Sequence, residues 1–117
     1  MSDEHTLSVV VCSYNGAKKL APCFDALVRQ HVPVDVLVVD DGSSDDTASL
    51  AESYGFSVIR HERNRGISAA RNSGLVYATT PLVAFCDDDC TPPDDWTEQL
   101  LAAWSEQPEV TVLGGVV

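Results

Sequence analysis

The sequence predicts an α/β protein: a Rossmann-like parallel sheet with helices on both faces. Short apolar runs rich in valine alternate with segments whose apolar residues recur at helical spacing, giving the order β-α-β-α-β-α-β-α-β. The leading runs lack the polar alternation of a half-solvated strand, which indicates strands buried on both faces. With 117 residues, the chain is long enough for one domain with its own core.

The first half of the chain contains two strands and two helices. Residues 7–13 form a β-branched strand that Asn15 and Gly16 end, and residues 17–31 then carry apolar side chains on one helical face up to Pro33. A second buried strand is expected over 34–40. It is followed by a helix over 47–54, which Gly55 ends.

The second half continues the same alternation. We expect a third strand over 56–60, a polar loop over 61–66, a helix over 67–78 and a fourth strand over 82–86. Prolines and aspartates at 92–95 predict the start of another helix, because both residue types suit a first turn. A fifth strand is expected over 110–117, interrupted by Gly114 and Gly115.

The domain organisation is simple. Residues 1–6 are expected to form an N-terminal tail and residues 7–117 one unit, because no repeat, linker or low-complexity segment divides them. The sequence ends in or after the expected fifth strand, so we expect a truncated half of a larger domain. A sheet cut there would expose apolar surface and an unpaired edge, which predicts a marginal fold or self-association.

The net charge of the chain excludes some classes of binding partner. There are 18 acidic side chains against 7 Lys and Arg, and the net charge is −11. Such a chain repels nucleic acid and anionic membrane surfaces. The N-terminus lacks the pattern of a signal peptide, and no apolar run reaches the roughly 18 residues of a membrane span. We therefore expect a cytoplasmic location, with any peripheral attachment to the inner membrane face arising from missing regions.

The cysteines do not predict a zinc site. None of the four (Cys12, Cys23, Cys86 and Cys90) belongs to a C-x-x-C pair, and the spacing of Cys86 and Cys90 is not typical of zinc ligands. Free thiols in a reducing compartment are the simpler interpretation.

Three of the predicted strands end in polar residues. The first ends in Ser13, Tyr14 and Asn15, the second in Asp40 and Asp41, and the fourth in the triple aspartate 87–89. In open parallel sheets, ligands bind beyond the carboxyl ends of the strands. If these strands are neighbours, their polar ends form one cleft. The alternative is that each is an ordinary solvated turn.

The three consecutive carboxylates predict a divalent cation. Adjacent aspartates repel one another unless a cation lies among them, and hard cations such as Mg²⁺ or Mn²⁺ prefer carboxylate oxygens. The chain has neither a Gly-x-Gly-x-x-Gly segment after its first strand nor a P-loop. An acidic cleft with a bridging metal suits a nucleoside diphosphate, whose sugar and base can donate to carboxylates.

Four segments together resemble the family 2 glycosyltransferases, which have the GT-A fold. The matching segments are 8–16, 36–47 with its Asp-Asp-Gly-Ser, 64–74 with its Ala-Arg-Asn, and 85–93 with its Asp-Asp-Asp. Their order and spacing make the resemblance specific, and it covers the chain from Leu7 to Val117. It implies that residues 7–117 are the nucleotide-sugar-binding half of a GT-A glycosyltransferase domain.

The resemblance also implies roles for individual residues in binding the donor. Asp41 would accept a hydrogen bond from the nucleotide base, which favours a UDP- or dTDP-sugar because uracil and thymine carry an N3–H. Tyr14 would border the base, with Ser13 and Asn15 beside it. Arg71 would approach the donor, or form a salt bridge with one of the aspartates.

The triple aspartate lies at the family's Asp-x-Asp position. The resemblance implies that Asp89 binds the metal, that Asp87 assists through water or as a nearby charge, and that Asp88 reaches the ribose. The implied cofactor is Mg²⁺ or Mn²⁺.

The function that follows is metal-dependent, inverting transfer of a sugar from a nucleoside diphosphate to an unknown acceptor. The general base is expected beyond Val117, so no catalytic residue is assigned, and this half alone is expected to be weakly active or inactive. A stand-alone nucleotide- or metal-binding module is the alternative. A receiver-type phosphoacceptor domain is disfavoured, since the only lysines, Lys18 and Lys19, fall in the first helix.

Overall fold

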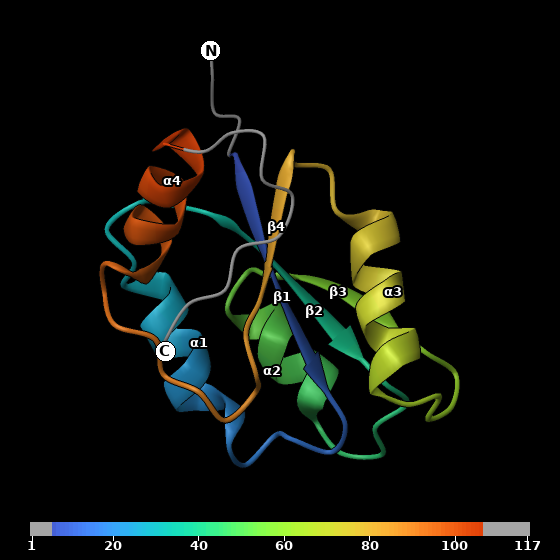
Figure 1. Ribbon diagram of the computed structural model, residues 1–117. Coiled ribbons are helices and arrows are strands. Elements are labelled where there is room, and N and C mark those ends of the chain that lie inside the picture. Colours follow the sequence, from blue (N-terminus) through green and yellow to red (C-terminus); the bar gives the residue numbers. More distant parts are fainter. Residues whose placement is uncertain (1–5, 107–117) are drawn as a thin grey trace.

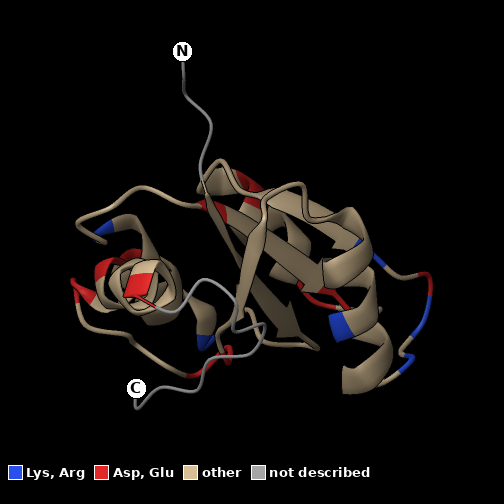
Figure 2. Ribbon diagram, turned by 45° about the horizontal axis from the view of Figure 1, so that its top comes forward, with Lys and Arg blue, Asp and Glu red and all other residues tan. Residues whose placement is uncertain are grey.

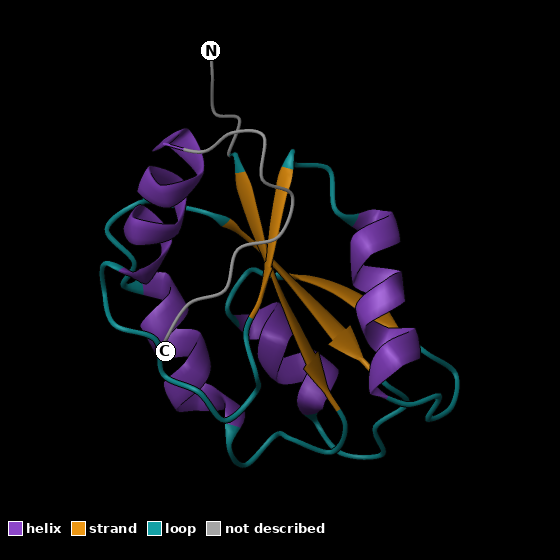
Figure 3. Cartoon of the chain, in the orientation of Figure 1, coloured by secondary structure: helices purple, strands orange, loops and turns teal. Residues whose placement is uncertain are grey.

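The computed structural model describes residues 6–106, which form a four-stranded parallel sheet in the order β3-β2-β1-β4. Figures 1 and 3 show the strands running side by side, with helices on both sides of the sheet. The elements, in chain order, are β1 (Leu7–Ser13), α1 (Leu20–Val28), β2 (Asp35–Asp40), α2 (Thr47–Ser53), β3 (Ser57–Arg60), α3 (Ile67–Tyr77), β4 (Leu82–Phe85) and α4 (Trp96–Glu106).

Two strands form the centre of the sheet. β1 pairs in parallel with β2 on one side and with β4 on the other, so that Val9 lies opposite both Val36 and Ala84. Val9, Val10 and Val11 of β1 have no exposed surface, as expected for a strand covered on both faces.

Alternate side chains of β1 and β2 face different helices. Val9, Val11, Val36 and Val38 lie in one core cluster with residues of α1, α2 and α4, including Phe24 and Trp96. Val10, Leu37 and Val39 lie in a second cluster with Ala70 of α3. This period of two follows from strand geometry and divides the helices into two layers. In Figure 1, α3 is accordingly separated from the other helices by the sheet.

Close contact between α3 and β1 depends on a glycine. A Cβ atom built on Gly74 would lie 2.5 Å from Cγ1 of Val10, well inside van der Waals contact. The absence of a side chain at this position therefore lets the helix lie directly on the central strand. This position of α3 brings its N-terminus to the carboxyl edge of the sheet.

The expected order of strands and helices is confirmed over the described residues, and the main differences are at element ends. The helix predicted over 17–31 is shorter, because residues 14–19 form turns between β1 and α1. β4 ends at Phe85, although the Cys86 amide still donates to the carbonyl oxygen of Val10. The fifth strand expected over 110–117 lies outside the described residues. Among residues 6–106, no helix is long and apolar enough to span a membrane.

Candidate functional site

A pocket of about 420 Å³ lies at the carboxyl edge of the sheet. The order β2-β1-β4 makes the three polar strand ends neighbours, and the loops that follow them gather at one edge in Figure 3. Of the eight residues that the sequence predicted for the site, six line the pocket: Ser13, Tyr14, Asp41, Asp87, Asp88 and Asp89. The predicted convergence of these residues is thus confirmed, while their ligands are not tested by the geometry.

Asp41 is held by donors that surround its carboxylate. Its Oδ1 accepts hydrogen bonds from the backbone N–H of Arg65 (2.9 Å) and from His61 Nδ1 (2.7 Å), and its Oδ2 accepts one from the N–H of Gly66 (2.8 Å). Burial favours the neutral acid, but the bonds from His61, Arg65 and Gly66 outweigh it and hold the pKa of Asp41 below its ordinary value. Asp41 is therefore an ionised acceptor, fixed in place.

The donors to Asp41 come from the β3–α3 loop. Gly66 immediately precedes α3 and has a positive φ of 98°, so the chain turns here and presents two successive amides to the carboxylate. This loop also carries Arg63 and Arg65, which are exposed. Figure 2 shows blue segments in the loop beside α3. An acidic site is thus bordered by a basic loop.

His61 was not predicted as a site residue. It follows β3 directly, and its ring bridges Asp41 and Ser73 of α3, with 2.8 Å between Nε2 and the Ser73 Oγ. The sequence did contain a signal, since His61 is the polar residue at the end of the third strand, the position that singled out the other site residues.

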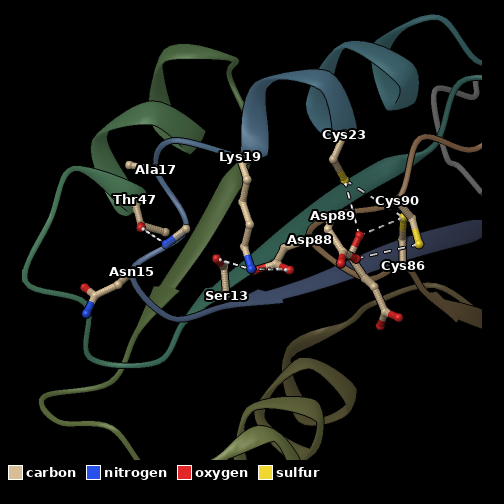
Figure 4. Close-up of polar contacts among 12 residues, drawn as sticks. Ser13, Asn15, Ala17, Lys19, Cys23, Thr47, Cys86, Asp88, Asp89 and Cys90 are labelled. Atoms are coloured by element: carbon tan, nitrogen blue, oxygen red, sulfur yellow. Dashed lines mark hydrogen bonds and ion pairs between the residues drawn. The ribbon is translucent and has the colours of Figure 1, made fainter.

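Asp88 is held from two sides. Ser13 Oγ donates a hydrogen bond of 2.8 Å to Asp88 Oδ2, and Lys19 Nζ lies 3.3 Å from Asp88 Oδ1 (Figure 4). Lys19, which also lines the pocket, was not expected there because the sequence placed it in the first helix. It lies instead in the turn before α1, and its charge partly balances the local carboxylates.

Asp87 and Asp89 lie on the exposed side of the same loop. One carboxylate oxygen of each lies within 4.8 Å of the other and of the Cys90 sulfur, a spacing that can hold a metal ion. Cys90 was not expected in this set, and its proximity to Asp89 is visible in Figure 4. Arg71 Nη2 lies 3.9 Å from Asp87 Oδ1, which is the salt-bridge alternative considered for this arginine.

Asn15 and Arg71 are the two predicted residues that do not line the main pocket. The Oδ1 of Asn15 accepts a hydrogen bond of 2.9 Å from the Ser44 N–H, and its own N–H donates to Ser43 Oγ at 2.8 Å. Asn15 also has a positive φ of 52°, a conformation that asparagine tolerates better than most residues. In this structure it therefore joins the loops that follow β1 and β2.

The thiols near the site are poor nucleophiles. Burial raises the pKa of Cys12 to about 11, and a hydrogen bond with Cys23 together with burial raises that of Cys86. The four cysteines are all free, and the sulfur atoms of Cys23 and Cys86 are 4.0 Å apart. Protonated thiols at these positions argue against covalent catalysis by cysteine.

Comparisons with known proteins identify the family of this chain. The model of the family "Glycosyl transferase family 2" matches residues 8–117. Glycosyltransferase AglE of Haloferax volcanii is 33% identical over 101 residues, which are 80% of this chain and 33% of that protein. This chain thus spans about one third of the length of that relative.

Solved structures show the same fold. S. aureus TarS 1–349 in complex with UDP-GlcNAc superposes with a TM-score of 0.84 at 29% identity, over 89% of this chain and 32% of that one. The mannosyltransferase PcManGT from Pyrobaculum calidifontis, in complex with GDP-Man and Mn²⁺, gives 0.80 at 27% identity, over 90% and 33%. Both share the parallel sheet and its helices with this chain, which belongs to glycosyl transferase family 2.

Proposed function

We propose that this chain is the donor-binding part of a metal-dependent, inverting glycosyltransferase that uses a nucleoside diphosphate sugar. The observation that carries the proposal is the placement of an ionised acceptor, Asp41, and the triple aspartate 87–89 around one pocket of about 420 Å³. TarS and PcManGT, which share the fold, were solved with UDP-GlcNAc and GDP-Man.

We assign the nucleotide base to the Asp41 side of the pocket. A carboxylate offers about four acceptor directions, and Asp41 uses three of them for His61, Arg65 and Gly66. The fourth, on Oδ2, can take only a donor, such as the N3–H of uracil or thymine. Tyr14, which is half exposed at the pocket, provides a ring against which the base can lie. These features favour a UDP- or dTDP-sugar.

The opposite side of the pocket is assigned to the ribose and the diphosphate. Asp88 accepts from Ser13 and Lys19, and its position lets it also accept from a ribose hydroxyl. Asp87 and Asp89 offer hard oxygen ligands at exposed positions, a donor set that fits Mg²⁺ or Mn²⁺, while Cys90 adds a softer sulfur ligand beside them. A bound divalent cation would neutralise charge on the departing nucleoside diphosphate. The identity of the metal is part of the proposal.

The transfer step requires a general base for the acceptor hydroxyl. An acceptor hydroxyl would attack the anomeric carbon from the side opposite the diphosphate, so that the C–O bond to the diphosphate breaks as the new bond forms. The hydroxyl proton must pass to a general base. We assign no such base among residues 6–106, and the acceptor is likewise unassigned.

The proposal is tested by calorimetric titration of UDP, GDP and dTDP, each with and without Mn²⁺. We expect UDP or dTDP to bind only with the metal, and Asp89→Asn to weaken that binding by at least about tenfold, because it removes a charged metal ligand. Glu52→Gln is the matched control, since it removes one exposed negative charge on α2, outside the pocket. Binding that is unchanged in D89N, or equal with and without metal, would contradict the assignment.

Release of free sugar from a UDP-sugar and Mn²⁺ distinguishes transfer from the alternative of a binding-only module. Slow hydrolysis by the wild-type chain, abolished in D89N, is the result expected if the chain retains part of the activity. Metal-dependent nucleotide binding without any turnover favours the binding module for this chain.

A further inference from the structure

The Asp41–His61 pair is almost completely enclosed. The two side chains are 6% and 5% exposed, and only 2.7 Å separates His61 Nδ1 from Asp41 Oδ1. The other ring nitrogen, Nε2, lies 2.8 Å from the Ser73 hydroxyl. The imidazole thus connects three elements: the end of β2, the end of β3 and the middle of α3.

The hydrogen-bond partners determine where the imidazole proton lies. Two backbone N–H groups point at the Asp41 carboxylate, so the acid is ionised and can only accept. Nδ1 must therefore donate. In the neutral ring, Nε2 then accepts from the Ser73 hydroxyl, which is free to rotate. Protonation at Nε2 would reverse only that second bond, so Nδ1 is the donor to Asp41 in either state.

We propose that His61 is a positioning residue of the donor site, which fixes the Asp41 carboxylate so that its free acceptor direction faces the nucleotide base. This inference rests on the proposed function, because it gives His61 a role only if Asp41 receives the base. The carboxylate can rotate about its Cβ–Cγ bond. The bond from Nδ1 opposes this rotation by holding Oδ1 together with the Arg65 N–H, and the open direction is left on Oδ2, the oxygen that accepts only from Gly66.

A purely structural role for His61 predicts different behaviour. If the ring only fills space between β3 and α3, any replacement of similar size should affect binding to the same extent as it affects stability. If the Nδ1–H matters, the replacement must keep a donor at the position of Nδ1. Asparagine places its amide nitrogen at the same number of bonds from Cα as Nδ1, whereas glutamine places it at the level of Nε2.

The experiment compares His61→Asn with His61→Gln in the full chain, with UDP as the probe in the presence of Mn²⁺. We expect H61N to bind UDP within about threefold of wild type, and H61Q to bind it about tenfold more weakly, because a displaced Asp41 carboxylate would lose its hydrogen bond to the nucleotide base. Urea unfolding should show that both variants are folded under the conditions of the titration. Inorganic pyrophosphate lacks a nucleotide base, so in the presence of Mn²⁺ it should bind both variants and the wild type equally.

Two further variants separate failure of this inference from failure of the proposed function. Asp41→Asn should weaken UDP binding at least as much as H61Q, and Ser73→Ala, which keeps the Nδ1–Asp41 bond, should leave it within about threefold of wild type. If D41N binds UDP normally, both proposals are wrong. If D41N weakens binding but H61N and H61Q bind alike, the proposed function stands and the positioning role of His61 is refuted.

Discussion

Replacing Gly42 by alanine should damage both the fold and the pocket, through the backbone of the β3–α3 loop. Gly42 follows Asp41 and has a positive φ of 78°. A Cβ atom built there would lie 2.3 Å from the carbonyl carbon of Arg63 and 2.5 Å from the amide nitrogen of Asn64. These are backbone atoms, so the contact cannot be relieved by rotating a side chain.

The size of the effect follows from these distances. An ordinary contact begins at 3.4 Å, so the loop must move outward by about 1 Å, and the bonds of 2.9 and 2.8 Å from Arg65 and Gly66 to Asp41 would exceed hydrogen-bond length. An alanine with positive φ costs about 1–2 kcal/mol. Losing part of two hydrogen bonds to a charged group, each worth about 1.5–3 kcal/mol, brings the expected loss of stability to about 3–5 kcal/mol.

Gly55→Ala provides the matched control. Gly55 has a φ of 80°, but a Cβ atom there would have no neighbour within 4 Å. This variant should therefore lose only about 1–2 kcal/mol, the cost of the backbone conformation alone. Urea unfolding measures both losses, and hydrogen exchange at the Arg65 and Gly66 amides reports the loop directly. If G42A is no less stable than G55A, or if both amides stay protected in G42A, the inferred link between Gly42 and the Asp41 site is wrong.

Two further predictions concern helix packing and pH. Gly74→Ala should destabilise the protein by about 1–2 kcal/mol, because the added Cβ would lie 2.5 Å from Val10 Cγ1, although alanine has the better helix propensity. In urea unfolding, the substitution Val10→Ala should cost less stability in the G74A variant than in the wild type. Strictly additive losses would contradict the contact. The lowered pKa of Asp41 stabilises the fold above the unfolded pKa of about 3.9, and this stabilisation is lost as the pH falls through the lower folded value. The free energy of unfolding should therefore decline below about pH 4 more steeply in wild type than in Asp41→Asn, and parallel curves would refute this.

The sequence alone determined the fold class and half of the residues that line the pocket. Its valine-rich strands, the helical periodicity between them and the polar residues at strand ends are local patterns, and local patterns are visible without a structure. The convergence of Ser13, Asp41 and the triple aspartate could be predicted because parallel strands present their carboxyl ends at one edge.

Only the tertiary structure decided which partner each polar side chain takes. Asn15 bonds to Ser44, Lys19 reaches Asp88, and the Cys90 sulfur lies within 4.8 Å of a carboxylate oxygen of both Asp87 and Asp89. Nothing in the local sequence distinguishes these side chains from solvated loop residues. The clearest case is His61, which joins Asp41 to Ser73 across separations of 20 and 12 residues. Such hydrogen bonds depend on side-chain directions at the ends of different strands and helices, and those directions are set by the packing of α3 on the sheet rather than by any local pattern.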